Sequence, residues 1–161
     1  MLFVLFVSLS VRSQTIYIVR HAEKAAQAAN MSSDVPLSEA GVQRAEELKR
    51  LLLKKKIAYI FSTDRIRTKS TGKPLSDAIG IPVELYANDT MPKFIERVKA
   101  LKKNVLIIGH SNTIDDLANT LCSEKKIPAD FAETDYDNLL IVKIKKKKTL
   151  FEHKTYGAAT Q

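Results

Sequence analysis

The chain has 161 residues, of which 45% are hydrophobic, and this fits one globular domain with an adequate core rather than two. It carries a formal net charge of +8, but its lysine runs at 54–56 and 145–148 contain no interleaved aromatic residues, which argues against nucleic-acid binding. The single cysteine, Cys122, excludes an intrachain disulfide. No Cys/His cluster has zinc spacing, so we expect neither a metal nor a cofactor.

Residues 1–11 form an apolar stretch that is too short to span a bilayer and resembles the hydrophobic part of a secretory signal. The small residues around Ser13 give a passable cleavage site, although no positive charge precedes the stretch. We therefore divide the chain into a signal-like segment, 1–13, and a single domain, 14–161. This predicts an exported protein with no membrane span in its mature chain. The alternatives are an extra apolar strand or an upstream start-codon artefact, with the protein then cytoplasmic.

The rest of the chain alternates between short apolar runs and segments with helical periodicity. In chain order, the pattern predicts a strand at 15–20, a helix capped by Ser38 and running to about residue 53, a strand at 58–61, a helix over 65–79 and a strand at 82–86. A helix from 90 to about 101, a strand at 104–109 and a helix over 113–121 follow, and the last two strands are predicted at 137–145 and 150–156. We expect Pro74 to interrupt the 65–79 helix by opening a second turn, and Gly80 to end it.

This alternation of strands and helices predicts an α/β fold. We expect a three-layer sandwich with a mostly parallel central sheet and helices on both faces. The last two strands flank a lysine-rich turn, so they should form a hairpin that adds an antiparallel edge.

Two basic residues, Arg20 and His21, lie at the end of the first predicted strand, directly after its apolar run. In open α/β sheets, ligands bind at the carboxyl ends of the strands, so these side chains are placed for ligand binding. Arginine offers a planar, permanently charged fork for phosphate, and histidine offers a nucleophile or general base near neutral pH. An exposed basic pair at a strand end would look the same, so this pair alone does not decide between the two interpretations.

A second apolar run, at 105–108, ends in Gly109 and His110, so two of the three histidines lie at the ends of the most strand-like runs. A third run, at 57–61, leads to Arg67 near the start of a predicted helix, where free backbone amides also favour anions. Together these segments predict a site for phosphate chemistry.

At this point the chain resembles the histidine phosphatase superfamily, also called the phosphoglycerate mutase-like family. The family signature is Arg-His-Gly, then Ser-Ser/Thr followed by Arg-Ala-x-x-Thr, then a later Gly/Ser-His. The matching segments here are Arg20-His21-Ala22, with alanine where glycine is usual, Ser62-Thr63 ahead of Arg67 and Thr71, and Gly109-His110-Ser111-Asn112-Thr113. Residues 36–41 also resemble the family's Leu-Ser/Thr-x-x-Gly helix start, and the compact length is similar to the phosphohistidine phosphatase branch.

The resemblance implies a histidine acid phosphatase-like phosphohydrolase that forms a phosphohistidine intermediate on His21. It places Arg20, Arg67 and His110 around the phosphate, without a metal. Ser111 and Asn112 could add phosphate contacts or could simply cap the following helix. Glu23 and Lys24 lie close to the pocket in sequence and could line its rim. The substrate would be a phosphorylated small molecule or a phosphoprotein, including phosphohistidine, and we expect a monomer.

In the family, an acidic residue between the second arginine and the second histidine usually protonates the leaving group. Glu84 lies inside a predicted strand and Glu96 lies more than a turn into a helix, so we favour Asp89, which lies in the loop between them. Its alternative role is to cap the helix near Thr90, where a stabilised carboxylate would be a poorer acid. A leaving group that needs no proton, such as a phosphorylated nitrogen, would make this acid dispensable.

Two other functions stay open at this point. The first is a phosphoglycerate mutase-type phosphotransferase, and the second is a non-catalytic phosphate-binding module. Mutases of the family carry insertions that shape the pocket, whereas only 42 residues separate Arg67 from His110. This leaves no room for a cap, which favours hydrolysis at an open site. A non-catalytic module would be expected to lack one of the four basic residues, and all four are present.

Overall fold

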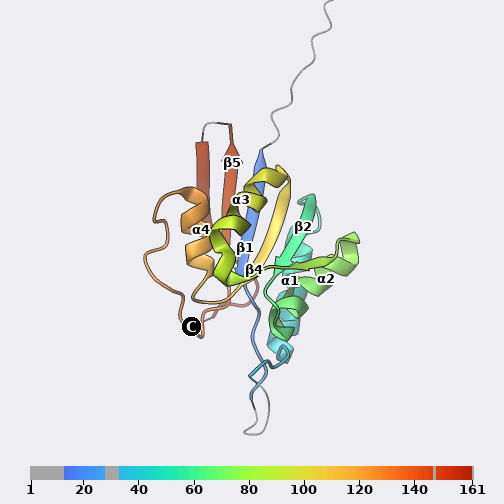
Figure 1. The fold of residues 1–161 in the computed structure, drawn as a ribbon. Coiled ribbons are helices and arrows are strands. Elements are labelled where there is room, and N and C mark those ends of the chain that lie inside the picture. Colours follow the sequence, from blue (N-terminus) through green and yellow to red (C-terminus); the bar gives the residue numbers. More distant parts are fainter. Residues whose placement is uncertain (1–12, 28–32, 147, 161) are drawn as a thin grey trace, which may run out of the picture.

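Six strands form one sheet with the order β3-β2-β4-β1-β5-β6 in the computed structural model, which describes residues 13–27, 33–146 and 148–160 (Figure 1). The strands are β1 (Gln14–Arg20), β2 (Ile57–Ser62), β3 (Val83–Leu85), β4 (Asn104–Gly109), β5 (Asn138–Lys145) and β6 (Lys148–Thr155). The neighbours among β3, β2, β4 and β1 pair in parallel, while β5 is antiparallel to β1 and β6 is antiparallel to β5. The predicted mostly parallel sheet with an antiparallel edge is confirmed.

The helices cover both faces of this sheet, which gives the predicted three layers (Figure 1). They are α1 (Glu39–Leu52), α2 (Ile66–Ile79), α3 (Met91–Leu101) and α4 (Ile114–Cys122). Leu48 of α1 and Leu75 of α2 belong to one hydrophobic cluster, and Val98 of α3 and Leu117 of α4 belong to the other. Because β1 and β4 contribute to both clusters, their continuous apolar runs are buried on both faces, as is usual for parallel strands.

Helix α2 is continuous, so the predicted interruption at Pro74 is wrong. Proline has no amide hydrogen and cannot donate to the carbonyl of Ser70, but one missing hydrogen bond does not end this helix. The flanking side chains of Thr71 and Leu75 are fully buried, and such tertiary packing supplies most of the stability of a protein helix. Gly80 ends the helix as predicted, with a left-handed φ of 69°.

The start of α1 packs against the loop that follows β1. Ser38 caps the helix as predicted, its hydroxyl accepting a hydrogen bond of 3.1 Å from the Gly41 amide. The Ser38 amide donates to the carbonyl of Glu23 at 2.9 Å. A Cβ atom at residue 41 would lie only 2.2 Å from that carbonyl oxygen, so the close approach requires glycine. The 36–41 motif therefore ties α1 to the segment that carries His21.

The signal-like segment predicted at the start of the chain falls on residues 1–12, which lie outside the described residues, and on the exposed Ser13. Gln14 already belongs to β1, and its side-chain amide donates to the carbonyl of Val98 at 2.7 Å. None of the helices in the described part of the chain is long and apolar enough to cross a membrane.

Candidate active site

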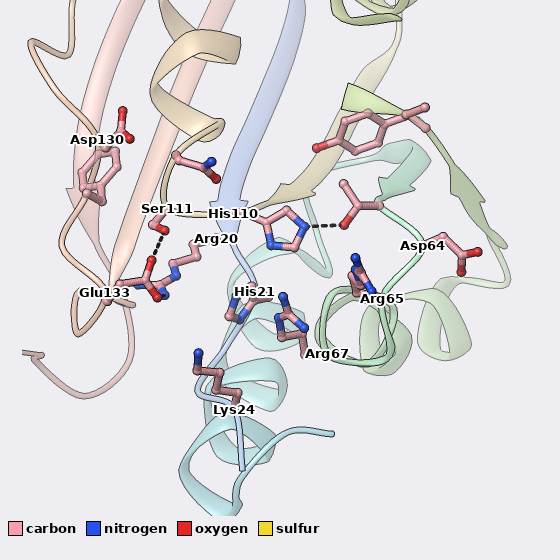
Figure 2. Close-up of a pocket in the computed structure, with 15 residues that line it drawn as sticks. Arg20, His21, Lys24, Asp64, Arg65, Arg67, His110, Ser111, Asp130 and Glu133 are labelled. Atoms are coloured by element: carbon pink, nitrogen blue, oxygen red, sulfur yellow. Dashed lines mark hydrogen bonds and ion pairs between the residues drawn. The ribbon is translucent and has the colours of Figure 1, made fainter. Parts of the chain in front are cut away.

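A cavity of about 820 Å³ lies at the carboxyl ends of β1, β2 and β4 (Figure 2). Residues that follow each of these strands line it, because parallel strands end at the same edge of the sheet. The lining residues include Arg20 at the end of β1, His21 and Lys24 after β1, Thr63, Asp64, Arg65 and Arg67 after β2, Tyr86 and Ala87 after β3, His110, Ser111 and Asn112 after β4, and Asp130, Phe131 and Glu133 ahead of β5. The structure thus brings Arg20, His21, Arg67 and His110 together from three separate segments.

The His21 ring is held in one orientation. Its backbone amide donates to the carbonyl of Gly109 at 2.9 Å, which continues the β1–β4 pairing by one residue. Its Nδ1 donates to the carbonyl of Ala22 at 2.8 Å, so the proton resides on Nδ1 and the lone pair of Nε2 is free. The side chain is only 3% exposed, and burial together with the charges of Arg20 and Arg67 lowers its pKa to about 3. At neutral pH, His21 is therefore an uncharged imidazole with a free Nε2.

Arg20 is 1% exposed and is held by the segment ahead of β5. Its Nη1 donates to the carbonyls of Ala132 and Asp135, and its Nη2 bonds to the carboxylate of Glu133 at 3.0 Å. The guanidinium lies 4.1 Å from the ring centre of Tyr136, a cation–π contact. These contacts fix the fork but leave its buried Nε without an acceptor among the described residues.

Arg67 lies in the first turn of α2 and, like Arg20, has a buried Nε without an acceptor among the described residues. Its Nη1 is 3.6 Å from the carboxylate of Asp34. Leaving a buried donor unpaired is costly, typically about 1–3 kcal/mol. Two such guanidinium donors among the described residues therefore point to an anion as the missing partner.

His110 lies beside His21, with 5.4 Å between the ring centres. Its Nε2 is 2.9 Å from the hydroxyl of Thr63, and in Figure 2 the other ring nitrogen faces the side where His21 and Arg67 lie. The Thr63 hydroxyl donates to the Thr68 hydroxyl at 3.1 Å, so its oxygen accepts a hydrogen bond from His110 Nε2–H, and the lone pair of the neutral ring lies on Nδ1. Burial, then the charges of Arg67, Arg65 and Arg20, lowers the pKa of His110 to about 4. His110 is thus uncharged at neutral pH, and its Nδ1 can donate a hydrogen bond to an anion only when the ring is protonated.

Ser111 and Asn112 line the cavity rather than cap α4, whose N-cap residue is Thr113. The Ser111 hydroxyl donates to the carboxylate of Glu133, which is the dashed contact on that side of Figure 2. The Thr113 hydroxyl accepts a hydrogen bond from the His110 amide at 3.0 Å and so shapes the turn that carries this histidine. Of the two alternatives left open by the sequence, placement at the cavity is the one observed.

Lys24 and Glu23 make different contacts in the structure. Lys24 lines the cavity, whereas Glu23 forms an ion pair of 2.7 Å with the buried Arg44 of α1. Arg44 also donates to the carbonyls of Tyr156 and Ala158 at 2.7 and 2.8 Å. This buried arginine therefore joins the segment after His21 to the residues that follow β6.

The structure does not bring Asp89 to the cavity. Asp89 lies in the 3₁₀ turn Asn88–Thr90 ahead of α3 and is not among the lining residues, and neither are Glu84 and Glu96. Glu84 instead bonds to Arg97 at 2.5 Å. The loop after β3 reaches the cavity only through its first two residues, Tyr86 and Ala87.

The acidic residue that sequence reasoning missed is Glu133. Its carboxylate binds both Ser111 and Arg20, and the Ser111 hydrogen bond, followed by the charges of Arg20 and Lys24, holds its pKa below the usual range. Glu133 lies in an irregular stretch with no periodicity or motif. Only one signal could have found it: because β5 is antiparallel, the residues just before Asn138 must lie at the active edge of the sheet.

The cavity as a whole favours anions. Four cationic side chains line it, those of Arg20, Lys24, Arg65 and Arg67. Three carboxylates also line it: Asp64, which pairs with Lys69, Glu133, which pairs with Arg20, and Asp130. Among the described residues, no group of three or more His, Cys, Asp or Glu side chains is placed to hold a metal ion.

A family model described as "Histidine phosphatase superfamily (branch 1)" matches residues 16–88. The probable phosphoglycerate mutase GpmB of Yersinia pestis (strain Pestoides F) is 36% identical over 69 residues, which are 41% of this chain and 32% of that protein. The chain thus matches about a third of the length of this curated relative. The family model's match includes Arg20, His21 and Arg67 but stops before His110.

Solved structures cover more of the chain. A protein histidine phosphatase SixA complexed with tungstate aligns with a TM-score of 0.69 and 18% identity, over 88% of this chain and 96% of that one. A mycobacterial glucosyl-3-phosphoglycerate phosphatase aligns with a TM-score of 0.65 and 13% identity, over 92% of this chain and 100% of that one. At these identities the similarity shows a shared fold, and the fold includes the β4 edge that carries His110.

Proposed function

We propose that this chain is a member of the histidine phosphatase superfamily and a metal-independent phosphatase acting through a phosphohistidine intermediate on His21. Its substrates are phosphate monoesters of small molecules or phosphorylated protein side chains, phosphohistidine among them. The observation that carries the proposal is the 2.8 Å hydrogen bond from His21 Nδ1 to the Ala22 carbonyl. It fixes the tautomer with a free Nε2 inside a cavity that is rich in cationic donors.

In the first step, the lone pair of His21 Nε2 attacks phosphorus in line with the leaving group. A P–N bond forms, the P–O or P–N bond to the leaving group breaks, and its electron pair departs with that group. Phosphoryl transfer depends mainly on positioning and on charge stabilisation. The two unpaired Nε–H donors of Arg20 and Arg67 supply that stabilisation at the equatorial oxygens, and His110 adds an Nδ1–H donor when the charge of the bound phosphate raises its pKa and the ring is protonated.

In the second step, water attacks the phosphohistidine and returns His21 to its neutral form with release of inorganic phosphate. Glu133 takes the place of Asp89 in our proposal for proton transfer. Its lowered pKa makes it a carboxylate at neutral pH, so it is suited to accept a proton from the attacking water. It is poorly suited to donate a proton to the first leaving group. The site therefore favours leaving groups that depart without protonation, such as aryl oxides or phosphorylated nitrogens.

A mutase must retain its substrate between two transfers, and the described chain offers little to enclose one. Between Arg67 and His110 it forms only the remainder of α2, the short β3, the turn before α3, α3 itself and β4. No further element of the described residues covers the cavity on this side. Hydrolysis by a monomer, with broad acceptance of small phosphorylated substrates whose leaving groups need no proton, is therefore the function that we favour. Export of the chain, predicted from residues 1–13, stays a prediction.

The proposal is tested by turnover of an activated aryl phosphate in the presence of EDTA. We expect full activity in the chelator, competitive inhibition by vanadate, and loss of turnover in His21→Ala. His153→Ala is the matched control, because His153 lies on β6 outside the cavity lining and its loss should leave turnover within about threefold. Inactivation by EDTA, or near-normal activity of His21→Ala, would rule out the mechanism. Transfer of phosphate to a second substrate molecule in preference to water would identify a mutase instead.

A further inference from the structure

The edge of the sheet opposite the cavity is crowded with exposed lysines. The topology gathers them there: β1, β2 and β4 are parallel, so their amino ends share one edge, and the antiparallel β5 brings its carboxyl end to the same edge. In Figure 1 this is the upper edge, where β1 begins and the β5–β6 hairpin turns. We call the exposed set the lysine edge: Lys54, Lys55 and Lys56 before β2, Lys102 and Lys103 before β4, and Lys145, Lys146 and Lys148 in the hairpin.

The exposed lysines of the lysine edge have no counter-charges among the described residues, since none of their side chains forms an ion pair there. Several lysines elsewhere do, for example Lys69 with Asp64 at 2.7 Å and Lys73 with Asp77 at 2.8 Å. Like charges held close together repel one another, and an anionic surface would relieve that repulsion.

The composition of the lysine edge indicates which anionic partner it fits. No aromatic side chain is interleaved with these lysines, whereas binding of single-stranded nucleic acid relies on aromatic stacking. Instead, the neighbouring Leu53 exposes 46% of its surface beside Lys54. The apolar residues 1–11 also join the domain here, since Gln14 begins β1 at this edge. A polybasic surface next to an apolar segment is the combination that binds anionic membranes, where two weak signals act together.

We propose that the lysine edge docks on an anionic phospholipid membrane. This orientation applies to the chain that keeps the apolar residues 1–11, which is the alternative to their cleavage, because β1 then begins at the edge that faces the membrane. The cavity at the opposite edge of the sheet then points away from the lipid. The enzyme would act at a membrane surface on phosphorylated groups in the adjoining solution, and docking would not depend on the cavity.

The test is co-sedimentation of the full chain with phosphatidylcholine vesicles that contain or lack phosphatidylglycerol. A test variant replaces one lysine from each loop, Lys54, Lys102 and Lys146, with glutamine. Each lysine near an anionic surface contributes about fivefold to the affinity, so the triple variant should bind on the order of 100-fold more weakly. Added salt should weaken binding of the wild type, because it screens surface charge.

The matched control replaces Lys73, Lys93 and Lys154 with glutamine, which removes the same net charge away from the lysine edge. It should bind anionic vesicles within about threefold of the wild type. Vanadate should not release the enzyme from the vesicles, and the bound enzyme should keep its turnover, because neither vanadate binding nor catalysis involves the lysine edge.

Three results would overturn the proposal. They are equal binding to neutral and anionic vesicles, equal weakening in the test and control variants, and tighter binding to DNA than to vesicles of the same charge density. Release of the enzyme by vanadate would also contradict it, because this would place lipid phosphate in the cavity.

Discussion

The buried His21 should remain uncharged far into the acidic range. Burial and the neighbouring arginines lower its pKa to about 3, compared with the usual value of 6.5. At pH 5, a histidine with a pKa of 3 is about 99% neutral, whereas one with a pKa of 6.5 is only about 3% neutral. Since the nucleophile must be neutral, kcat/KM at pH 5 should be about 30-fold higher than a solvent-exposed histidine would allow.

The assay is kcat/KM for an aryl phosphate across the acidic range, divided by the fraction of substrate present as the dianion. An NMR titration of the His21 ring carbon then assigns the ionisation directly. Arg67→Gln removes one of the nearby cations, so it should raise the pKa of His21 and of His110. A titration of His21 near pH 6.5 in the folded protein would refute the reasoning.

The lowered pKa of His21 also makes the free energy of unfolding depend on pH. The folded pKa lies below the unfolded value, so the unfolded chain takes up the proton first as the pH falls. Stability should therefore decline below about pH 6.5 by about 1.4 kcal/mol per pH unit for His21, until its folded pKa is reached. The acid limb of the activity must accordingly be measured together with urea unfolding. His21→Asn should make the stability less dependent on pH in this window.

Three further predictions follow from particular contacts. Arg44→Met should lower the free energy of unfolding by about 3–5 kcal/mol in urea melts, because it leaves the partly buried Glu23 carboxylate and two carbonyls without their donor. Arg50→Met, at an exposed ion pair, should change it by less than about 0.5 kcal/mol, and equal losses in the two variants would refute the contribution of the Arg44 contacts. Gly41→Ala should cost about 1–3 kcal/mol in the same melts, since its Cβ would lie 2.2 Å from a carbonyl oxygen, and an unchanged midpoint would contradict the close approach. Glu133→Gln should slow hydrolysis of the phosphoenzyme by about 10²–10⁴-fold in rapid-quench kinetics. Asp89→Asn should change turnover by less than about threefold for substrates with poor and with good leaving groups alike, because Asp89 does not line the cavity. A loss in Asp89→Asn that depends on the leaving group would identify Asp89 as the acid.

The sequence was sufficient for the sheet and for the four basic side chains that line the cavity. Short continuous apolar runs rich in β-branched residues are typical of strands buried on both faces, and parallel strands must present their carboxyl ends at one edge. His21 and His110 each follow such a run, so their proximity followed from the strand pattern alone. The cap at Ser38 and the helix end at Gly80 were equally local, since one side chain or one left-handed residue suffices for each.

Features that depend on tertiary packing could not be predicted. Helix α2 continues through Pro74 because buried neighbours outweigh one lost hydrogen bond. Glu133 lies in an irregular stretch, and its place beside Arg20 depends on how β5 enters the sheet. Asp89 was favoured because a loop after a strand reaches the active edge, but that loop turns into α3 before residue 89 can line the cavity.

The central claim is that His21 carries the phosphoryl group during turnover. The most direct measurement is to quench the enzyme rapidly in alkali while it turns over an aryl phosphate, and to map the phosphorylated residue by mass spectrometry. We predict an alkali-stable, acid-labile phosphate on the peptide that contains His21, formed equally in EDTA and absent from His21→Ala. Turnover with no phosphoenzyme, or with phosphate on another residue, would contradict the account.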